Sequence, residues 1–184
     1  EWNNHYSATK WLLLDADLRK PGIGKVFSLS NGGNAGLVGY LTGACSLGEV
    51  IWTHPVIPNL AAVPCGPIPP NPAELLSSQR MREAIDFLRR DHKFIIMDSP
   101  PLLWVSDAVI LSVLADGVLL LVRSGETPKE ALTRAQEVLA GVKCRLLGVV
   151  LNAVDFSSPY YPYYYSYKYY HYAYGDDGPK HPES

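Results

Sequence analysis

The chain has 184 residues, of which 47% are hydrophobic and 18% are charged, enough for one domain with a core and a tail. A formal net charge of −2 excludes a generally basic nucleic-acid-binding protein, because such proteins present a positive surface to phosphates. The three cysteines form no CxxC pair, which argues against a disulfide framework or a zinc knuckle.

Three stretches differ in composition. Residues 1–10 show no clear period and predict an irregular N-terminal segment. Residues 11–156 have the pattern of a globular domain. Residues 157–184 lack Leu, Ile, Val, Met, Phe and Trp, so we expect a disordered, tyrosine-rich tail.

Short apolar runs in the globular part predict parallel strands covered on both faces, since successive positions are apolar. These runs lie at 11–14, 60–63, 94–97, 118–122 and 146–151.

Helix signals separate the runs. Asn71 and Thr127 are each followed by a proline and, three positions on, by a glutamate, a pattern typical of helix starts. These starts predict helices over 73–90 and from 128 to about 141, and 105–114 reads as a buried helix. Strands alternating with helices predict an α/β fold with a doubly wound, mostly parallel sheet.

Acidic residues follow two of these strands. Asp15 and Asp17, with Arg19, leave the first strand, and Asp98 leaves the third. Ligands bind beyond the carboxyl ends of parallel strands, so we expect the three carboxylates to meet there. A Mg²⁺ ion held with waters and phosphates would relieve their repulsion, and a carboxylate could accept a proton during phosphoryl transfer. For any single aspartate, capping of the next turn is the simpler interpretation.

These segments carry a resemblance to a known family. LLLDADLRKP at 12–21 resembles the Walker A′ motif, and FIIMDSPP at 94–101 the Walker B motif, of the bacterial tyrosine kinases of capsule and exopolysaccharide export. Segments 66–78, 106–130 and 148–152 are also similar, and a C-terminal tyrosine cluster is the family's other hallmark. The resemblance spans about residues 12–174 and implies a P-loop NTPase-like fold.

The resemblance implies a role for each matching residue. Asp15 and Asp17 would support Mg²⁺–ATP and take the proton of the acceptor tyrosine. Asp98 would act on Mg²⁺ through water, so that Asp15 and Asp98 are the expected metal residues. Arg19 and Asn152 would contact the nucleotide, with Asn152 near the adenine base.

Ten tyrosines in the tail are the expected phosphate acceptors, presented to a neighbouring subunit. Each phosphate adds about −1.5 to −2 charges, which would loosen an assembly that docks the tail. Considered alone, the tail fits equally well a low-complexity segment that merely associates. The tyrosines are Tyr160, Tyr161, Tyr163, Tyr164, Tyr165, Tyr167, Tyr169, Tyr170, Tyr172 and Tyr174.

The 184 residues contain no phosphate-binding loop of the form G-x-x-x-x-G-K-[ST]. PGIGKV at 21–26 has the wrong glycine spacing and no hydroxyl, and reads as a turn. We therefore expect a fragment of a longer kinase or a degraded copy that binds ATP poorly. We also expect the neighbours of the strand that would precede this loop to expose apolar faces and unpaired backbone edges, and we expect marginal folding or aggregation.

The family implies an autokinase that moves the γ-phosphate of ATP to the tail in trans and regulates capsule or exopolysaccharide synthesis and export. Expected partners are further copies in a ring, a membrane-embedded polysaccharide co-polymerase or activator, fused or separate, and a tyrosine phosphatase, but no nucleic acid. The expected location is cytoplasmic, at the inner face of the cell membrane, and cysteines without a pairing pattern fit the reduced thiols of a cytosol. The longest apolar run, 109–122, is too short and polar to cross a bilayer.

Two other interpretations remain open. One is a related P-loop ATPase without kinase activity, which would have no use for the tyrosine cluster. The other is an inactive remnant or binding module whose tail another kinase phosphorylates.

Overall fold

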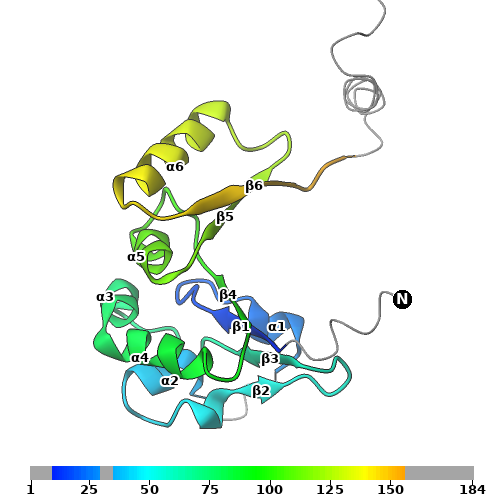
Figure 1. Ribbon diagram of the computed structural model, residues 1–184, viewed down its shortest axis with the longest axis vertical. Helices are drawn as coiled ribbons and strands as arrows, with labels where there is room; N and C mark the ends of the chain where they lie inside the picture. Colours follow the sequence, from blue (N-terminus) through cyan, green and yellow to red (C-terminus); the bar gives the residue numbers. More distant parts are fainter. Residues whose placement is uncertain (1–9, 30–34, 156–184) are drawn as a thin grey trace, which may run out of the picture.

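The computed structural model describes residues 10–29 and 35–155, whose strands form two sheets (Figure 1). The larger sheet has the order β2-β3-β1-β4. Strand β1 pairs in parallel with β3 and β4, and the short β2 is antiparallel to β3. Its strands are β1 (Trp11–Asp15), β2 (Trp52–Thr53), β3 (Leu60–Val63) and β4 (Phe94–Asp98).

The smaller sheet pairs β5 (Val118–Arg123) in parallel with β6 (Leu146–Asn152). All five predicted strands are therefore present, and the α/β class with parallel strands and flanking helices is confirmed. The sequence predicts one sheet, whereas the structure divides the strands between two. Within the described ranges, β4 pairs only with β1 and β5 only with β6.

Burial on both faces holds for β1 and β3 but is wrong for β4, β5 and β6. Strand β4 exposes Phe94 and Ile96 to 45% and 51%, and β5 exposes Leu119 and Leu121 to 57% and 62%. Among the described residues each of these strands is paired on one side only, and the elements packed on its faces leave these apolar side chains partly uncovered. The predicted exposure of apolar strand faces is thus observed.

Helices flank both sheets. Helices α1 (Ile23–Val26) and α2 (Gly36–Leu41) follow β1, and the 3₁₀ turn η1 (Gly48–Val50) precedes β2. Segment 21–26, predicted as a turn, contains α1. Helices α3 (Pro72–Ser77) and α4 (Gln79–Leu88) lie between β3 and β4, followed by α5 (Asp107–Leu114) and α6 (Lys129–Gly141).

The predicted helix over 73–90 is broken into α3 and α4 at Ser78. The extended backbone of Ser78 (ψ 160°) ends α3, and its Oγ accepts a hydrogen bond from the Met81 amide at 3.3 Å. Ser78 therefore caps α4. Pro72 is the first residue of α3, as expected. The Asn71 side chain, however, donates a hydrogen bond to the Glu74 carboxylate and does not cap the backbone.

Two further helix predictions need small corrections. Helix α6 begins at Lys129 with Pro128 as its cap residue, because the Thr127 hydroxyl instead accepts from the Arg123 amide at 2.9 Å. Helix α5 is not buried on all sides, since Val113 is 59% exposed.

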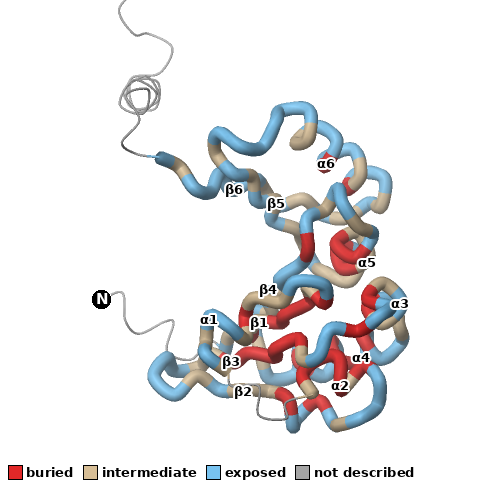
Figure 2. The backbone as a smooth tube through the Cα atoms, turned by 180° about the vertical axis from the view of Figure 1, so that it is seen from behind, coloured by how far each residue is buried: buried red, intermediate tan, exposed pale blue. Residues whose placement is uncertain are grey.

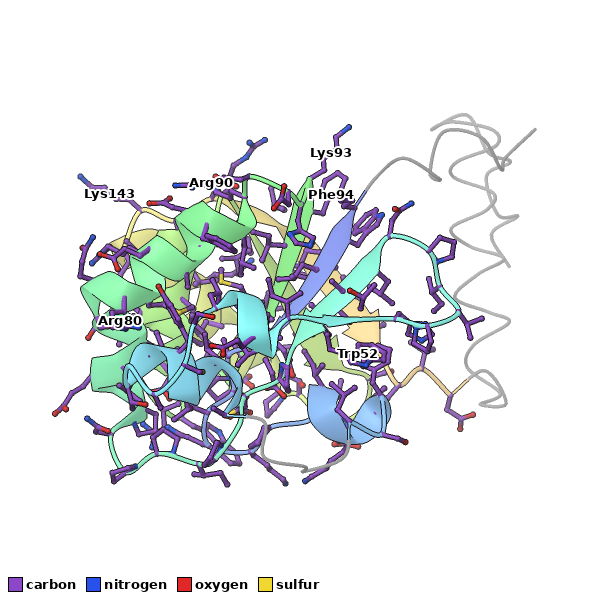
Figure 3. All side chains as sticks on the ribbon, turned by 90° about the horizontal axis from the view of Figure 1, so that it is seen from below. Trp52, Arg80, Arg90, Lys93, Phe94 and Lys143 are labelled. Atoms are coloured by element: carbon purple, nitrogen blue, oxygen red, sulfur yellow. The ribbon has the colours of Figure 1, made fainter. Side chains whose placement is uncertain are left out.

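The core lies around the larger sheet. Figure 2 shows buried segments gathered on β1, β3 and the helices beside them, whereas β5 and β6 are mostly half-buried or exposed. Leu12 and Leu14 of β1 pack with Val63, Met81 and Leu88. At the amino end of β1, Trp11 stacks on Phe94 with ring centroids 4.4 Å apart. Figure 3 shows Phe94 beside Lys93 at the amino end of β4.

Candidate functional site

Asp15 and Asp98 end adjacent parallel strands and stand opposite each other in the register of β1 and β4. Asp15 is completely buried, and its Oδ2 accepts a hydrogen bond from the Ile23 amide at 3.0 Å. Its second oxygen, Oδ1, has no hydrogen-bond partner among the described residues. An unpartnered buried carboxylate oxygen is costly, so this atom marks a position suited to a ligand.

Asp17 lies in the turn that follows β1. Its Oδ1 accepts from the backbone amides of Arg19 and Lys20, at 3.1 and 2.9 Å. This local bonding, common for aspartate in turns, fixes the carboxylate relative to its own loop. Asp17 is half-buried, so one side of it can meet a molecule arriving from outside.

Burial and neighbouring charges affect the protonation of the two carboxylates that end the strands. Burial raises the pKa of Asp15 most, with further increases from the charges of Asp98 and Asp17, against the lowering effect of the Ile23 hydrogen bond. Desolvation raises the pKa of Asp98, and the charge of Asp17 adds to it. The structure thus brings together the three aspartates predicted from the strand ends.

Arg19 forms a two-point ion pair with Asp107 at the start of α5. Its Nε lies 2.8 Å from Oδ2 of Asp107, and a terminal guanidinium nitrogen lies 3.0 Å from Oδ1. Asp107 is completely buried, whereas the Arg19 side chain is 42% exposed. Asp107 is not among the site residues predicted from the sequence, where its signal is a lone acid inside the apolar run 105–114.

The other predicted residues lie elsewhere. Asn152 ends β6 in the smaller sheet, where its backbone oxygen accepts from the Ser124 amide and its side chain from the Ala153 amide, both at 2.8 Å. It does lie at the carboxyl end of a parallel strand, as the sequence predicts. The ten tail tyrosines are outside the described residues, and the role of Asn152 in nucleotide binding remains a prediction.

The donor set suits a hard cation. Mg²⁺ prefers oxygen ligands and is usually bound by one or two carboxylates completed by waters and phosphates. The free Oδ1 of Asp15 and the carboxylate of Asp98 offer such ligands. Across 10–29 and 35–155, no cluster of three or more His, Cys, Asp or Glu forms a complete metal site. The residues therefore fit Mg²⁺ that arrives with a phosphate ligand.

A cysteine lies behind the carboxylates. Cys65 is buried, and its pKa is raised to about 12, mainly by burial and further by the charges of Asp15 and Asp17. A thiol in these surroundings stays protonated, so it is not a nucleophile at neutral pH.

No helix in the described parts of the chain has the length and apolarity needed to span a bilayer.

Comparison with known proteins identifies relatives along most of the chain. No family model matches it. It is 42% identical over 148 residues to the tyrosine-protein kinase YwqD of Bacillus subtilis, covering 80% of the chain and 61% of that protein. It is 34% identical over 156 residues to the tyrosine-protein kinase CpsD of Streptococcus pneumoniae, covering 85% of the chain and 68% of that protein.

A solved structure shows the same arrangement of elements. The kinase domain of the Escherichia coli tyrosine kinase ETK aligns with a TM-score of 0.76 and 32% identity, over 83% of this chain and 58% of that one. The chain spans about three fifths of the length of the first curated relatives that it matches. Given these identities and the acidic motifs at the ends of β1 and β4, the chain belongs to the family of bacterial tyrosine-protein kinases.

Proposed function

We propose that this protein is a tyrosine kinase that transfers the γ-phosphate of ATP to the tyrosines between 160 and 174 on a neighbouring copy. The observation that carries the proposal is the meeting of Asp15, Asp17 and Asp98 at the carboxyl ends of two paired strands. Membership of the tyrosine-kinase family and ten tyrosines in the tail support it.

The carboxylates differ in burial, and this difference suits them to different roles. Asp15 is completely buried and cannot reach the hydroxyl of a tyrosine from another chain, so it serves the Mg²⁺–phosphate side with Asp98. Asp17 is half-buried and stands near Asp98, which suits it to accept the phenolic proton. Mg²⁺, when bound, would offset the negative charge of the phosphates.

The proposed reaction is a direct phosphoryl transfer. The tyrosine oxygen forms a bond to the γ-phosphorus, the bond from that phosphorus to the bridging oxygen of ATP breaks, and ADP leaves. The phenolic proton passes to Asp17. Arg19 and Asn152 are the proposed nucleotide contacts, as the family resemblance implies.

The cellular setting belongs to the same proposal. A similar protein of Klebsiella pneumoniae is named a putative tyrosine-protein kinase in the cps region, and a similar solved structure is titled a chimerical protein CapA2B2. We propose that the chain acts in a ring of copies, at the inner face of the cell membrane. A membrane-embedded polysaccharide co-polymerase would activate it, and a tyrosine phosphatase would reset it.

Mass spectrometry of the tail tests this function. The chain is isolated from its source cells, and its variants are expressed in a host without another tyrosine kinase. Asp17→Asn and Asp15→Asn should reduce tail phosphate by about 10²-fold or more, because proton transfer or charge placement is lost. Asp116→Asn, an exposed control that breaks only the ion pair with Arg89, should retain it.

Each outcome separates the alternatives. A tail without phosphate in the source cells contradicts the proposal, and ADP release without tail phosphate identifies an ATPase. Tail phosphate that persists in Asp17→Asn and Asp15→Asn, when they are expressed in source cells whose own wild-type copy has been deleted, shows that another kinase modifies the tail.

A further inference from the structure

We propose that Asp107 is a positioning residue for the carboxylate site and acts through Arg19. This inference deepens the proposed kinase function. Asp107 lies 88 residues after Arg19 in the sequence, at the first turn of α5, and meets it in a two-point ion pair at 2.8 and 3.0 Å. The pair joins the loop after β1 to a helix that follows β4.

Burial makes this pair a fixed point. Asp107 has no exposed surface, and a buried carboxylate is tolerated only when its charge is paired and its oxygens are hydrogen-bonded. Arg19 supplies both requirements with a planar fork that matches the carboxylate. Asp107 therefore holds the Arg19 guanidinium in one orientation.

The loop transmits that orientation to Asp17. The backbone amides of Arg19 and Lys20 both donate to Oδ1 of Asp17. A loop fixed at Arg19 consequently fixes the direction of the Asp17 carboxylate, which follows the end of β1, where Asp15 stands opposite Asp98 of β4. Without the anchor, the short turn from 16 to 20 would have several arrangements, and Asp17 would spend less time at the site.

The same geometry defines what Arg19 does. Two of its guanidinium nitrogens are engaged by Asp107, and the charge of the fork is neutralised there. The main role of Arg19 is thus to anchor the acidic loop, and contact with a nucleotide is secondary. Asp107 does not engage the third guanidinium nitrogen, and the Arg19 side chain is 42% exposed, so this nitrogen is the group that Arg19 can offer to a nucleotide.

Amide exchange in the full chain, measured by NMR, tests the anchor without relying on kinase activity. In Asp107→Asn, the Arg19 and Lys20 amides should exchange with water at least about tenfold faster, because the Asp17 turn opens more often. The amides of Leu12 and Leu14 in β1 should keep their rates. Asp116→Asn, which breaks another Arg–Asp pair between distant segments, is the matched control and should leave the Arg19 and Lys20 rates unchanged.

Arg19→Lys provides a second variant if Asp107→Asn does not fold. It keeps the positive charge but loses the fork, and should accelerate the same two amides. Unchanged exchange at Arg19 and Lys20 in the folded variants overturns the proposal. So does a parallel acceleration of all amides, which indicates a general stabilising role.

Kinetics gives an independent outcome where the wild-type chain phosphorylates its tail. Asp107→Asn should lower kcat about tenfold or more while KM for ATP changes less than about threefold, since proton transfer and not binding is disturbed. A loss of kcat/KM of the same size that comes only from a higher KM contradicts the assignment of Asp107 as a positioning residue. A wild-type chain without kinase activity overturns the proposed function, while the exchange rates still decide the role of Asp107.

Discussion

Asp15 and Asp107 are both completely buried carboxylates, but their surroundings differ. Asp107 shares its charge with Arg19, whereas Asp15 faces Asp98 and Asp17 and leaves one oxygen without a partner among the described residues. The ion pair of Asp107 with Arg19 stabilises the folded state, whereas the like charges around Asp15 destabilise it. Sites that collect like charges in this way are typical of places where a protein trades stability for chemistry.

The raised pKa of Asp15 predicts a pH-dependent cost to stability. The folded state holds this proton more tightly than the unfolded state, whose ordinary value is 3.8. Stability therefore falls as the pH rises from about 4 through the folded pKa. Asp15→Asn keeps an acceptor for the Ile23 amide and removes the charge. Its urea midpoint should exceed that of the wild type at pH 7, and the difference should disappear near pH 4.

The control substitution, Asp116→Asn, should change the urea midpoint in the opposite direction. Arg89 lowers the pKa of Asp116, so Asp116→Asn should lower the midpoint at pH 7 slightly, as expected of an exposed pair. An Asp15→Asn variant that is less stable than the wild type across the whole pH range would show that the carboxylate has a stabilising partner.

The Cys65 thiol should resist alkylation in the native protein. Its pKa of about 12 leaves almost no thiolate at pH 8, and its side chain is buried. Peptide mass spectrometry after iodoacetamide treatment should show Cys45 and Cys144, both half-buried, modified at least about 100-fold faster than Cys65. Equal rates would mean that the end of β3 opens readily.

At the scale of elements, the start of α2 depends on a close backbone approach. Gly36 has φ +56°, and a Cβ there would lie 2.3 Å from the Gly66 nitrogen. The Leu37 and Val38 amides donate to Pro64 and Cys65 at 2.8 and 2.9 Å, which fastens α2 to the segment after β3. No side chain fits between these two segments.

Gly36→Ala should therefore destabilise the protein by about 2 kcal/mol or more, through both strain and overlap. Chemical denaturation measures the change. Gly141→Ala is the matched control, because nothing lies within 4 Å of its added Cβ at the end of α6, and it should change stability by less than about 1 kcal/mol. Similar effects of both substitutions would contradict the packing seen here.

Local signals predicted the elements well but not their pairing. The runs that became β1 and β3 are apolar at successive positions, and the proline at 72 marks the start of α3. The break at Ser78 was missed, because serine interrupts a helix only when its side chain caps the next turn. The acidic site was predicted from strand ends, yet Asp107 was not, since 88 residues separate it from Arg19.

At the scale of the whole molecule, the division into two sheets leaves apolar strands open. Strand β4 exposes Ile96, and β5 exposes Leu121, while β6 exposes Leu147 and Leu151 to 54% and 58%. Figure 1 shows the smaller sheet and α6 standing apart from the larger sheet, with α5 between them. Unpaired strand edges with apolar side chains are sites where chains add to one another.

This openness predicts marginal folding and association for the 184 residues. The chain should bind a fluorescent apolar dye such as ANS, melt over a broad range and sediment as larger species at rising concentration. Leu121→Lys places a charge on an open strand face where the native side chain is already 62% exposed, so it should reduce association with little loss of stability. Leu14→Ala, in the buried core, should instead cost about 2–5 kcal/mol. A sharp two-state melt of a soluble monomer that ignores ANS would contradict the prediction, because it would require the exposed faces of β4, β5 and β6 to be covered within one chain.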